Sequence, residues 1–290
     1  MSTKTDSNPL TFLYLSEPDA IAAGVTDMAA CVDAMEETLT LLATGDYRMA
    51  GADGDSHGAM VTFPKTSTFP GMPVDGPDRR FMAMPAYLGG SFGTAGVKWY
   101  GSNVGNRDQG LPRSLHLFTL SDRDTGVPLM VMSANLLSAY RTGAIPGVGA
   151  RRLARPDATD VCIVGPGVMG RTGLESYLAV LPELDTLRIV GRGRANAEKF
   201  AAWASSKFPQ LRSVTICDSV QEGVRGADVI HVGASTPPDV ATYPYLASEW
   251  LKPGAFVCSV ANTRMDNDLL TGSASLFVDN LGLYTTWAEE

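Results

Sequence analysis

The sequence contains few of the residues that build metal centres and disulfide frameworks. Among its 290 residues there are three histidines and four cysteines, and the cysteines have no C-x-x-C spacing. Few histidines disfavour a histidine-rich metal site. Scattered cysteines are typical of buried free thiols in a reducing compartment. We therefore expect no metal and a cytoplasmic location.

Long apolar runs and an excess of positive charge are also missing. No uninterrupted apolar segment is long enough to span a bilayer, and residues 1–9 lack the apolar core of a signal peptide. The formal net charge of −8 disfavours electrostatic binding to nucleic acid or to anionic membranes. These absences leave a small molecule as the expected partner of a globular protein that is 44% hydrophobic.

Glycine, by contrast, is plentiful at one informative place. Residues 160–173 read as a buried strand, a G-x-G-x-x-G turn and the start of a helix. Such a turn lets the backbone approach a dinucleotide pyrophosphate, and the helix N-terminus offers free N–H groups. The alternative is a glycine-rich turn that binds nothing. The residues expected to contact the cofactor here are Gly165, Gly167, Val168, Met169 and Gly170.

The end of the next strand indicates which cofactor binds. An acidic residue usually stands there to bind the ribose 2′-hydroxyl of NAD. Here the strand Thr186–Val190 is followed by Arg192 and Arg194, with no acid. Guanidinium groups suit a 2′-phosphate. The pattern therefore favours NADPH, with NAD as the alternative, unless the two arginines are only solvated surface charges.

The periodicity of apolar residues changes along the chain. The first half predicts a helix after a cap at Ser16 or Asp19, and a meander of strands. The later part alternates strands with helices. We therefore predict an α+β domain with an antiparallel sheet, followed by an α/β Rossmann domain. The main predicted strands are at 11–15, 60–63, 80–88, 94–100, 114–120, 128–132, 160–164, 186–190, 229–232, 255–260 and 276–279, with a helix at about 134–155.

Four further motifs occur in a distinctive order with the glycine turn: residues 96–100, 110–114, 124–128 and 137–144. In these motifs the chain resembles the ornithine cyclodeaminase/μ-crystallin family over nearly its whole length. The resemblance implies a substrate/dimerisation domain over 1–135, to which residues from about 278 to 290 return, and a dinucleotide-binding domain over 136–277. It also implies an active site in the cleft between the domains, and a homodimer.

Basic residues in apolar patterns mark the expected substrate site. Lys98 lies within a strand and Arg141 within an apolar helix pattern, where an unpaired charge is costly unless an anion meets it. The resemblance implies that Arg48, Lys98 and Arg141 hold the substrate carboxylate, and we expect Lys98 and Arg141 to be catalytic. The alternatives are a snorkelling Lys98 and an Arg141 paired with an internal acid.

Other positions are expected to assist. Arg113 is a further candidate for binding a carboxylate, with a surface turn as the alternative. The resemblance places Ser235 and Thr236 on the nicotinamide side of the cofactor, although they are also ordinary turn residues before Pro237.

The chain departs from true cyclodeaminases at one position. These resemble one another in a G-G-D loop whose aspartate is assigned the proton and amine chemistry. Here Thr263 stands at that position and is expected to contact the substrate. A threonine cannot act as a carboxylate base near neutral pH. Asp266, three residues later, is expected to point elsewhere.

Taken together, these features predict an NADPH-dependent oxidoreductase that reduces α-imino or α-keto acids to an amino acid or a secondary amine. Two alternatives remain open. One is a lyase that converts ornithine to proline and ammonia with bound NAD. The other is a non-catalytic NADPH-binding subunit.

Overall fold

The structure is a computed structural model that describes residues 10–51, 54, 58–236 and 239–282. The chain forms two compact units. The first contains the residues up to Thr26, Glu37–Ser138 and the residues from Asn280 onward; the second contains Asp27–Glu36 and Ala139–Asp279. The division after Ser138 lies near the predicted one, but Asp27–Glu36 groups with the second unit. The predicted domain limits stay a prediction.

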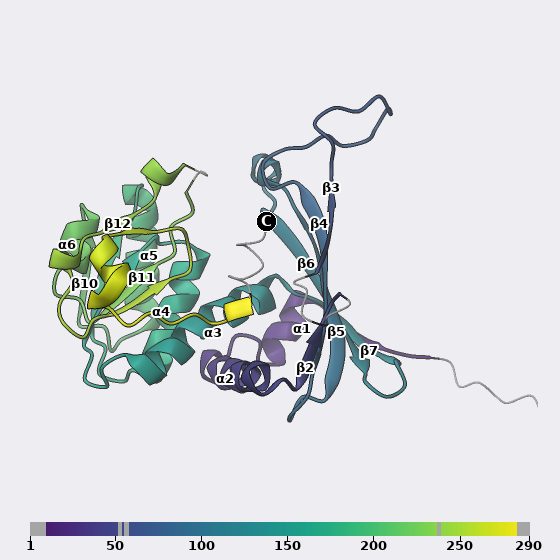
Figure 1. Ribbon diagram of the computed structural model, residues 1–290, viewed down its shortest axis with the longest axis horizontal. Coiled ribbons are helices and arrows are strands. Elements are labelled where there is room, and N and C mark those ends of the chain that lie inside the picture. The colour runs from purple at the N-terminus through teal and green to yellow at the C-terminus, as the bar shows by residue number, and fades with distance from the viewer. Residues whose placement is uncertain (1–9, 52–53, 55–57, 237–238, 283–290) are drawn as a thin grey trace, which may run out of the picture. The chain divides into compact units, whose positions relative to one another are not determined.

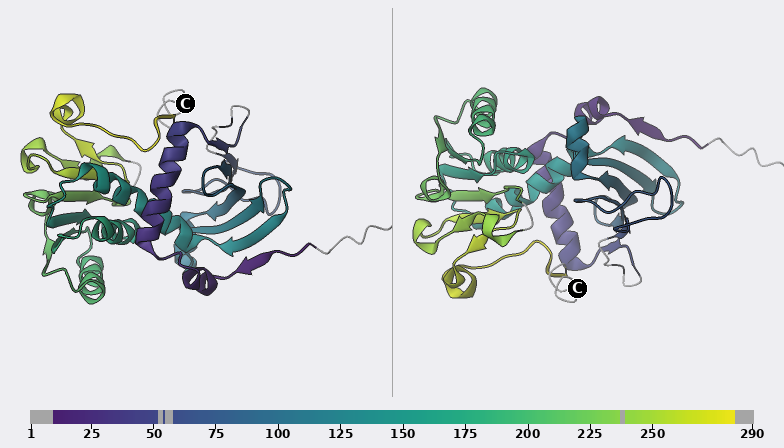
Figure 2. Two further views of the ribbon diagram at one scale, coloured as in Figure 1. Left: turned by 90° about the horizontal axis from the view of Figure 1, so that it is seen from below. Right: turned by 90° about the horizontal axis from the view of Figure 1, so that it is seen from above.

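A mostly antiparallel sheet forms the first unit (Figure 1). Its central strands are long and pair in register from end to end. The edge strand β1 runs parallel to β7, and both β2 and β3 pair with β4. Figure 2 shows this sheet curving away from β1, which is drawn in purple. The strands are β1 (Leu13–Leu15), β2 (Tyr47–Met49), β3 (Ala59–Thr62), β4 (Arg80–Leu88), β5 (Thr94–Ser102), β6 (Ser114–Asp122) and β7 (Pro128–Ser133), in the order β1-β7-β6-β5-β4-β2.

The predicted first helix is in fact two helices, α1 (Glu17–Ala22) and α2 (Met28–Thr44). Ser16 caps α1 and forms a capping box with Asp19. The chain then turns at Gly24, whose φ of 95° suits glycine. The helix predicted at 134–155 is α3 (Asn135–Leu153), with Pro146 inside it, and a 3₁₀ helix, η1 (Val104–Gln109), lies between β5 and β6.

The second unit is built around a parallel sheet. Its strands are β8 (Asp160–Val164), β9 (Thr186–Val190), β10 (Ser213–Cys217), β11 (Val229–Val232) and β13 (Phe256–Ser259), in the order β10-β9-β8-β11-β13. The helices between them are α4 (Val168–Val180), α5 (Arg194–Lys207) and α6 (Val220–Val224). The strand order reverses between β8 and β11. In doubly wound folds a dinucleotide binds at this switch point, beyond the carboxyl ends of the strands.

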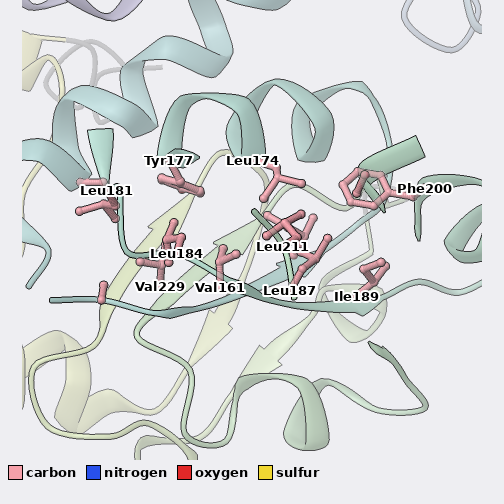
Figure 3. Close-up of a cluster of buried hydrophobic side chains, with 14 of the residues drawn as sticks. Val161, Leu174, Tyr177, Leu181, Leu184, Leu187, Ile189, Phe200, Leu211 and Val229 are labelled. Carbon is pink, nitrogen blue, oxygen red and sulfur yellow. The ribbon is translucent and has the colours of Figure 1, made fainter. Parts of the chain in front are cut away.

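Apolar side chains fix helix α4 against this sheet. Leu174 and Tyr177 of α4 are fully buried and face Val161 of β8 and Leu187 of β9 (Figure 3). This packing sets the position of the first turn of α4 relative to the end of β8.

The last part of the second unit is less regular. It contains the short strands β12 (Tyr245–Leu246) and β14 (Arg264–Met265), the 3₁₀ helices η2 (Val240–Thr242) and η3 (Ser248–Trp250), and the π-helical turn η4 (Leu269–Ser273). The strand predicted at 276–279 was wrong. These residues form no strand, and Phe277 is 66% exposed, so the apolar run has no neighbouring strand to pair with. Over the described ranges, no helix is long and apolar enough to cross a membrane.

Candidate functional site

The glycine turn after β8 has the geometry that a dinucleotide site requires. Gly165 has a φ of +106°, and a Cβ there would lie 2.5 Å from the backbone N of Ala234. A Cβ on Gly170 would lie 2.4 Å from the carbonyl oxygen of Gly165. Packing therefore demands glycine at both positions.

The middle glycine is different, because, apart from its chain neighbours and its own helix backbone, no described atom lies within 4 Å of the position that a Cβ would take. Gly167 is the N-cap residue of α4 and offers no side chain to its free N–H groups. Val168, the first residue of the helix, is 60% exposed, and Met169 follows it. An open backbone at a helix N-terminus fits the pyrophosphate of a dinucleotide.

Two segments expected around the cofactor meet in the structure. Arg192, just after β9, donates from Nη2 to the carbonyl of Ser235 at 2.5 Å, so the ends of β9 and β11 are joined. Thr236 is half-buried and follows Ser235. Arg194 begins α5, and its exposed guanidinium contacts Glu198 at 3.2 Å and Asp218 at 3.5 Å. Exposed pairs of this kind contribute little free energy, so Arg194 can exchange partners.

Lys98 lies on an aromatic face of the sheet in the first unit. It is two residues from Tyr100, so both side chains leave β5 on the same face. The Lys98 Nζ lies 5.1 Å from the centre of the Tyr100 ring, a cation–π contact. The Tyr100 ring is in turn 5.1 Å from that of His116. The buried tyrosine thus connects Lys98 with His116.

Arg48 lies on the opposite face of this sheet. It pairs with Tyr87, whereas Lys98 pairs with Met84, and positions 84 and 87 of one strand face opposite sides. Its Nη1 donates to the carbonyls of Tyr47 at 2.5 Å and Gly45 at 3.1 Å. The structure does not bring Arg48 to the face that carries Lys98, and its role as a carboxylate ligand stays a prediction.

A different arginine, Arg80, lies beside Tyr100. It shares the face of Lys98, and its Cζ lies 5.9 Å from the centre of the Tyr100 ring. Its Nη1 pairs with Asp78, which also accepts an ion pair from Arg113 at 3.3 Å. Sequence reasoning missed Arg80. The available signal was the alternation of side chains along a strand. Arg80 and Met84 are four positions apart on β4 and so leave the same face, and Met84 pairs with Lys98.

Arg141 belongs to the second unit, on helix α3. That helix lies close to α4, since a Cβ on Gly143 would lie 2.3 Å from the side chain of Thr172 in α4. The charge of Arg141 acts on Cys31, although burial dominates and raises the pKa of that thiol. Arg141 therefore stands within one turn of the contact between α3 and α4, the helix that follows the glycine turn.

The segment after β13 holds its polar side chains in local hydrogen bonds. The Thr263 hydroxyl contacts the Ser259 hydroxyl at 2.5 Å and the carbonyl of Ala261 at 3.0 Å. Asp266 accepts bonds from the Tyr245 hydroxyl and from the backbone N–H of Ser248, at 2.8 Å for the latter. These bonds lower the pKa of Asp266. The expectation that Asp266 points away from Thr263 is confirmed.

Comparison with known proteins identifies the family of this chain. Residues 24–290 match the ornithine cyclodeaminase/mu-crystallin family. The N-((2S)-2-amino-2-carboxyethyl)-L-glutamate dehydrogenase of Staphylococcus aureus is 25% identical over 92% of this chain and 74% of its own length. The ketimine reductase mu-crystallin of Mus musculus is 34% identical over 68% of this chain, a match that spans 60% of the mouse protein.

Solved structures show the same fold. An archaeal alanine dehydrogenase dimer with bound NAD superposes with a TM-score of 0.67 at 27% identity, over 85% of this chain and 66% of that one. A Δ(1)-pyrroline-2-carboxylate reductase of Thermococcus litoralis, in complex with NADH and L-proline, gives a TM-score of 0.71 at 24% identity, over 89% and 72%. At 24% identity, the similarity to the Thermococcus litoralis protein shows only that the two chains share a fold.

Proposed function

This chain belongs to the ornithine cyclodeaminase/mu-crystallin family. From this membership and from the candidate site, we propose that it is an NADPH-dependent reductase of α-imino or α-keto acids. Its product would be an amino acid or a secondary amine. The observation that carries the proposal is the open glycine turn at Gly167. It is held by two glycines that packing requires, Gly165 and Gly170. Packing would allow a side chain at position 167, so the absence of one there is explained by a ligand that approaches the exposed backbone.

The preference for NADPH rests on the end of β9. Arg192 lies there, directed to the Ser235 carbonyl, and Arg194 is exposed in weak ion pairs that a 2′-phosphate can replace. Two guanidiniums in a segment after β9 that carries no acidic residue suit a phosphate better than a ribose hydroxyl. When bound, the nicotinamide supplies a hydride to the carbon of the substrate imine.

The protein's own residues bind the substrate and deliver the proton. We assign Lys98 to the α-carboxylate or to protonation of the amine nitrogen, since its ammonium lies against the Tyr100 ring. Arg141 is the further ligand of the α-carboxylate, and Arg113, paired with Asp78, is a candidate ligand for a carboxylate elsewhere on the substrate. An imine that gains a hydride at carbon and a proton at nitrogen becomes an amine, so positioned cations and a hydride donor meet the needs of the reaction.

Thr263 favours reduction over the lyase reaction. Its hydroxyl is bonded to Ser259 and Ala261, and Asp266 is held by Tyr245. Neither can serve as the acid–base carboxylate that ring closure of ornithine demands.

A homodimer completes the proposal. Four large apolar side chains of β4, β5 and β6 stand 41–46% exposed on the sheet face opposite Lys98: Phe81, Trp99, Leu115 and Leu117. They line a hollow of about 630 Å³ in the first unit. A second copy of the same chain is the occupant we propose, since an apolar patch of this kind marks an interaction surface and the related archaeal alanine dehydrogenase is a dimer.

The test is oxidation of NADPH, followed at 340 nm, with α-keto acids plus ammonia or methylamine and with cyclic imino acids. Turnover with any of them is the expected result. Formation of proline from ornithine without added cofactor would replace the proposal with the lyase. Binding of NADPH without turnover of any substrate would replace it with a non-catalytic subunit.

A further inference from the structure

A second basic group lies beside Lys98 on the same face of the sheet. Arg80 pairs in register with Ser102, and Lys98 is four residues before Ser102 on β5, so all three side chains leave on one face. The Lys98 Nζ and the Arg80 Cζ lie 5.1 Å and 5.9 Å from the centre of the Tyr100 ring, so the two charges are at most about 11 Å apart, the sum of these distances.

Asp78 holds Arg80 and Arg113 together. One of its oxygens pairs with Arg80; the other lies 3.3 Å from Nη1 of Arg113 and accepts a 2.5 Å hydrogen bond from the Ser102 hydroxyl. The Asp78 side chain is only 16% exposed, compared with 33% for Arg80 and 52% for Arg113. The acid therefore lies beneath the two guanidiniums, and one carboxylate cannot neutralise both.

The backbone around this cluster is fixed in advance of any ligand. Asp78 has a φ of +57°, and it is the sole non-glycine residue with a positive φ among those that the structure describes. Strained conformations of this kind persist where the surrounding structure enforces them, and they are frequent at ligand sites. The carbonyl of Arg113 accepts bonds from the Asn103 N–H at 2.9 Å and the Asn106 side chain at 3.3 Å.

Arg80 retains hydrogen-bonding capacity. Its Nη1 donates to Asp78 and its Nη2 to the Tyr100 hydroxyl at 3.4 Å, and each of these nitrogens carries a second N–H; its Nε is buried without an acceptor within the described part of the chain. A guanidinium has five N–H donors in a planar fork that matches a carboxylate. Two such groups over one half-buried acid form a preorganised anion site.

We propose that Arg80 and Arg113, held by Asp78, bind a second carboxylate of the substrate, so that the substrate is an α-imino or α-keto dicarboxylic acid. The inference rests on the proposed function, which places the α-carboxylate or the reacting nitrogen at Lys98. A five-carbon diacid, with a hydrogen bond of about 3 Å at each end, spans the gap between these cations.

The test compares two ligands of equal chain length, 2-oxoglutarate and 2-oxopentanoate, which differ in the terminal carboxylate. The affinity for each ligand is measured by calorimetric titration of the 290-residue protein saturated with NADP⁺. The oxidised cofactor cannot donate a hydride, so no turnover occurs during the titration. We expect 2-oxoglutarate to bind at least 10-fold more tightly. Arg80→Gln and Arg113→Gln should each reduce this preference below 3-fold without changing the affinity for 2-oxopentanoate.

Arg79→Gln is the matched control, because it removes the same charge one residue away and Arg79 donates to the Val74 carbonyl at 2.9 Å. It should leave the preference intact. Thermal unfolding checks that Arg80→Gln folds, and Arg113→Gln, at a more exposed position, tests the site if it does not.

Three results would overturn the inference. Equal affinity for both ligands in the wild type would do so while leaving the proposed function standing. Equal weakening of both ligands by Arg80→Gln would place Arg80 at the shared keto-acid end instead. Binding of neither ligand by a protein that still binds NADP⁺ would remove the inference and the proposed function together.

Discussion

The Tyr177 hydroxyl and Nδ1 of His231 lie 3.0 Å apart in the fully buried interior of the second unit. Gly173 and Gly233 pack against the imidazole, and a Cβ on either would lie within 3.0 Å of the ring. His231 thus fills the space beneath the first turns of α4, close to the glycine turn. Burial lowers the pKa of His231 to about 4, although the Met169 backbone favours the charged ring.

This burial predicts a loss of stability in mild acid. The folded-state pKa of about 4 is below the reference value of 6.5, so between these pH values the unfolded chain binds more protons. The free energy of unfolding should therefore fall by about 2 kcal/mol from this group between pH 7 and pH 5. Urea unfolding of the wild type and of His231→Asn at both pH values measures it.

His231→Asn should lack this part of the pH dependence. Tyr177→Phe is the control, because it removes the hydrogen bond and keeps the buried imidazole, so its pH dependence should match the wild type. An equal change between pH 7 and pH 5 in the wild type and in His231→Asn would show that His231 does not cause it.

Two glycines of the nucleotide turn should separate folding from cofactor binding. Gly165→Ala forces a Cβ onto a backbone with φ of +106° and against Ala234, so it should destabilise the fold by about 2 kcal/mol or more. Gly167→Ala enters open space, so stability should change by less than about 1 kcal/mol. The Kd for NADPH should nevertheless rise at least about 10-fold, because the Cβ obstructs the pyrophosphate.

Urea unfolding and titration of NADPH fluorescence measure the two effects on the same preparations. If Gly167→Ala bound NADPH as tightly as the wild type, the pyrophosphate would not lie at this turn.

Much of the fold could be predicted from sequence, because the strands of both sheets are short runs rich in apolar and β-branched residues bounded by turn residues. The prediction at 80–88 matches β4 at both ends. An apolar pattern does not reveal whether a partner strand exists, which is why 276–279 was mistaken for a strand. The break between α1 and α2 depends on a left-handed glycine that periodicity does not detect.

The site could be predicted less completely, because it depends on register. Lys98 and the glycine turn are recognisable from local motifs. Arg80 joins Lys98 only through the pairing of β4 with β5, and Arg48 is placed on the opposite face only through the pairing of β2 with β4. These pairings join residues distant in the chain, and a one-residue shift in either would reverse the result.

Arg192 should determine the choice between the two nicotinamide cofactors. A charge-assisted contact to the 2′-phosphate contributes about 1.5–3 kcal/mol, so Arg192→Ala should raise the Kd for NADPH by about 10-fold or more. The Kd for NADH should change less than about 3-fold, since NADH lacks that phosphate. Arg212→Ala is the control, because Arg212 is an exposed arginine paired only loosely with Asp185 at 3.7 Å. Equal weakening of both cofactors would argue against a 2′-phosphate contact.

The apolar face of the first sheet should control the oligomeric state. Phe81 and Trp99 stack there with ring centres 5.8 Å apart, and Leu117 is 46% exposed. The double variant Trp99→Lys, Leu117→Lys should convert a dimer to a monomer in light scattering after size exclusion, with an unchanged circular dichroism spectrum. Leu270→Lys, at a 49% exposed leucine of the second unit, should stay dimeric. A wild type that is monomeric at micromolar concentration would contradict the proposed dimer.

Lys98 and Arg48 form the sharpest test of the substrate site, because they lie on opposite faces of one sheet. Lys98→Met keeps the length and apolar body of the side chain but removes the ammonium. It should lower kcat/KM at least about 10³-fold, because no ammonium then stabilises the charge that develops in the transition state. The Kd for NADPH should stay within about 3-fold of the wild-type value. Arg48→Gln should change kcat/KM by less than about 3-fold, because its guanidinium contacts the Gly45 and Tyr47 carbonyls instead. Steady-state kinetics with a reactive imine measures both variants. A similar loss of kcat/KM in Arg48→Gln would mean that Arg48 does hold the substrate carboxylate, as the family resemblance implies. In that case β2 must shift when the substrate binds.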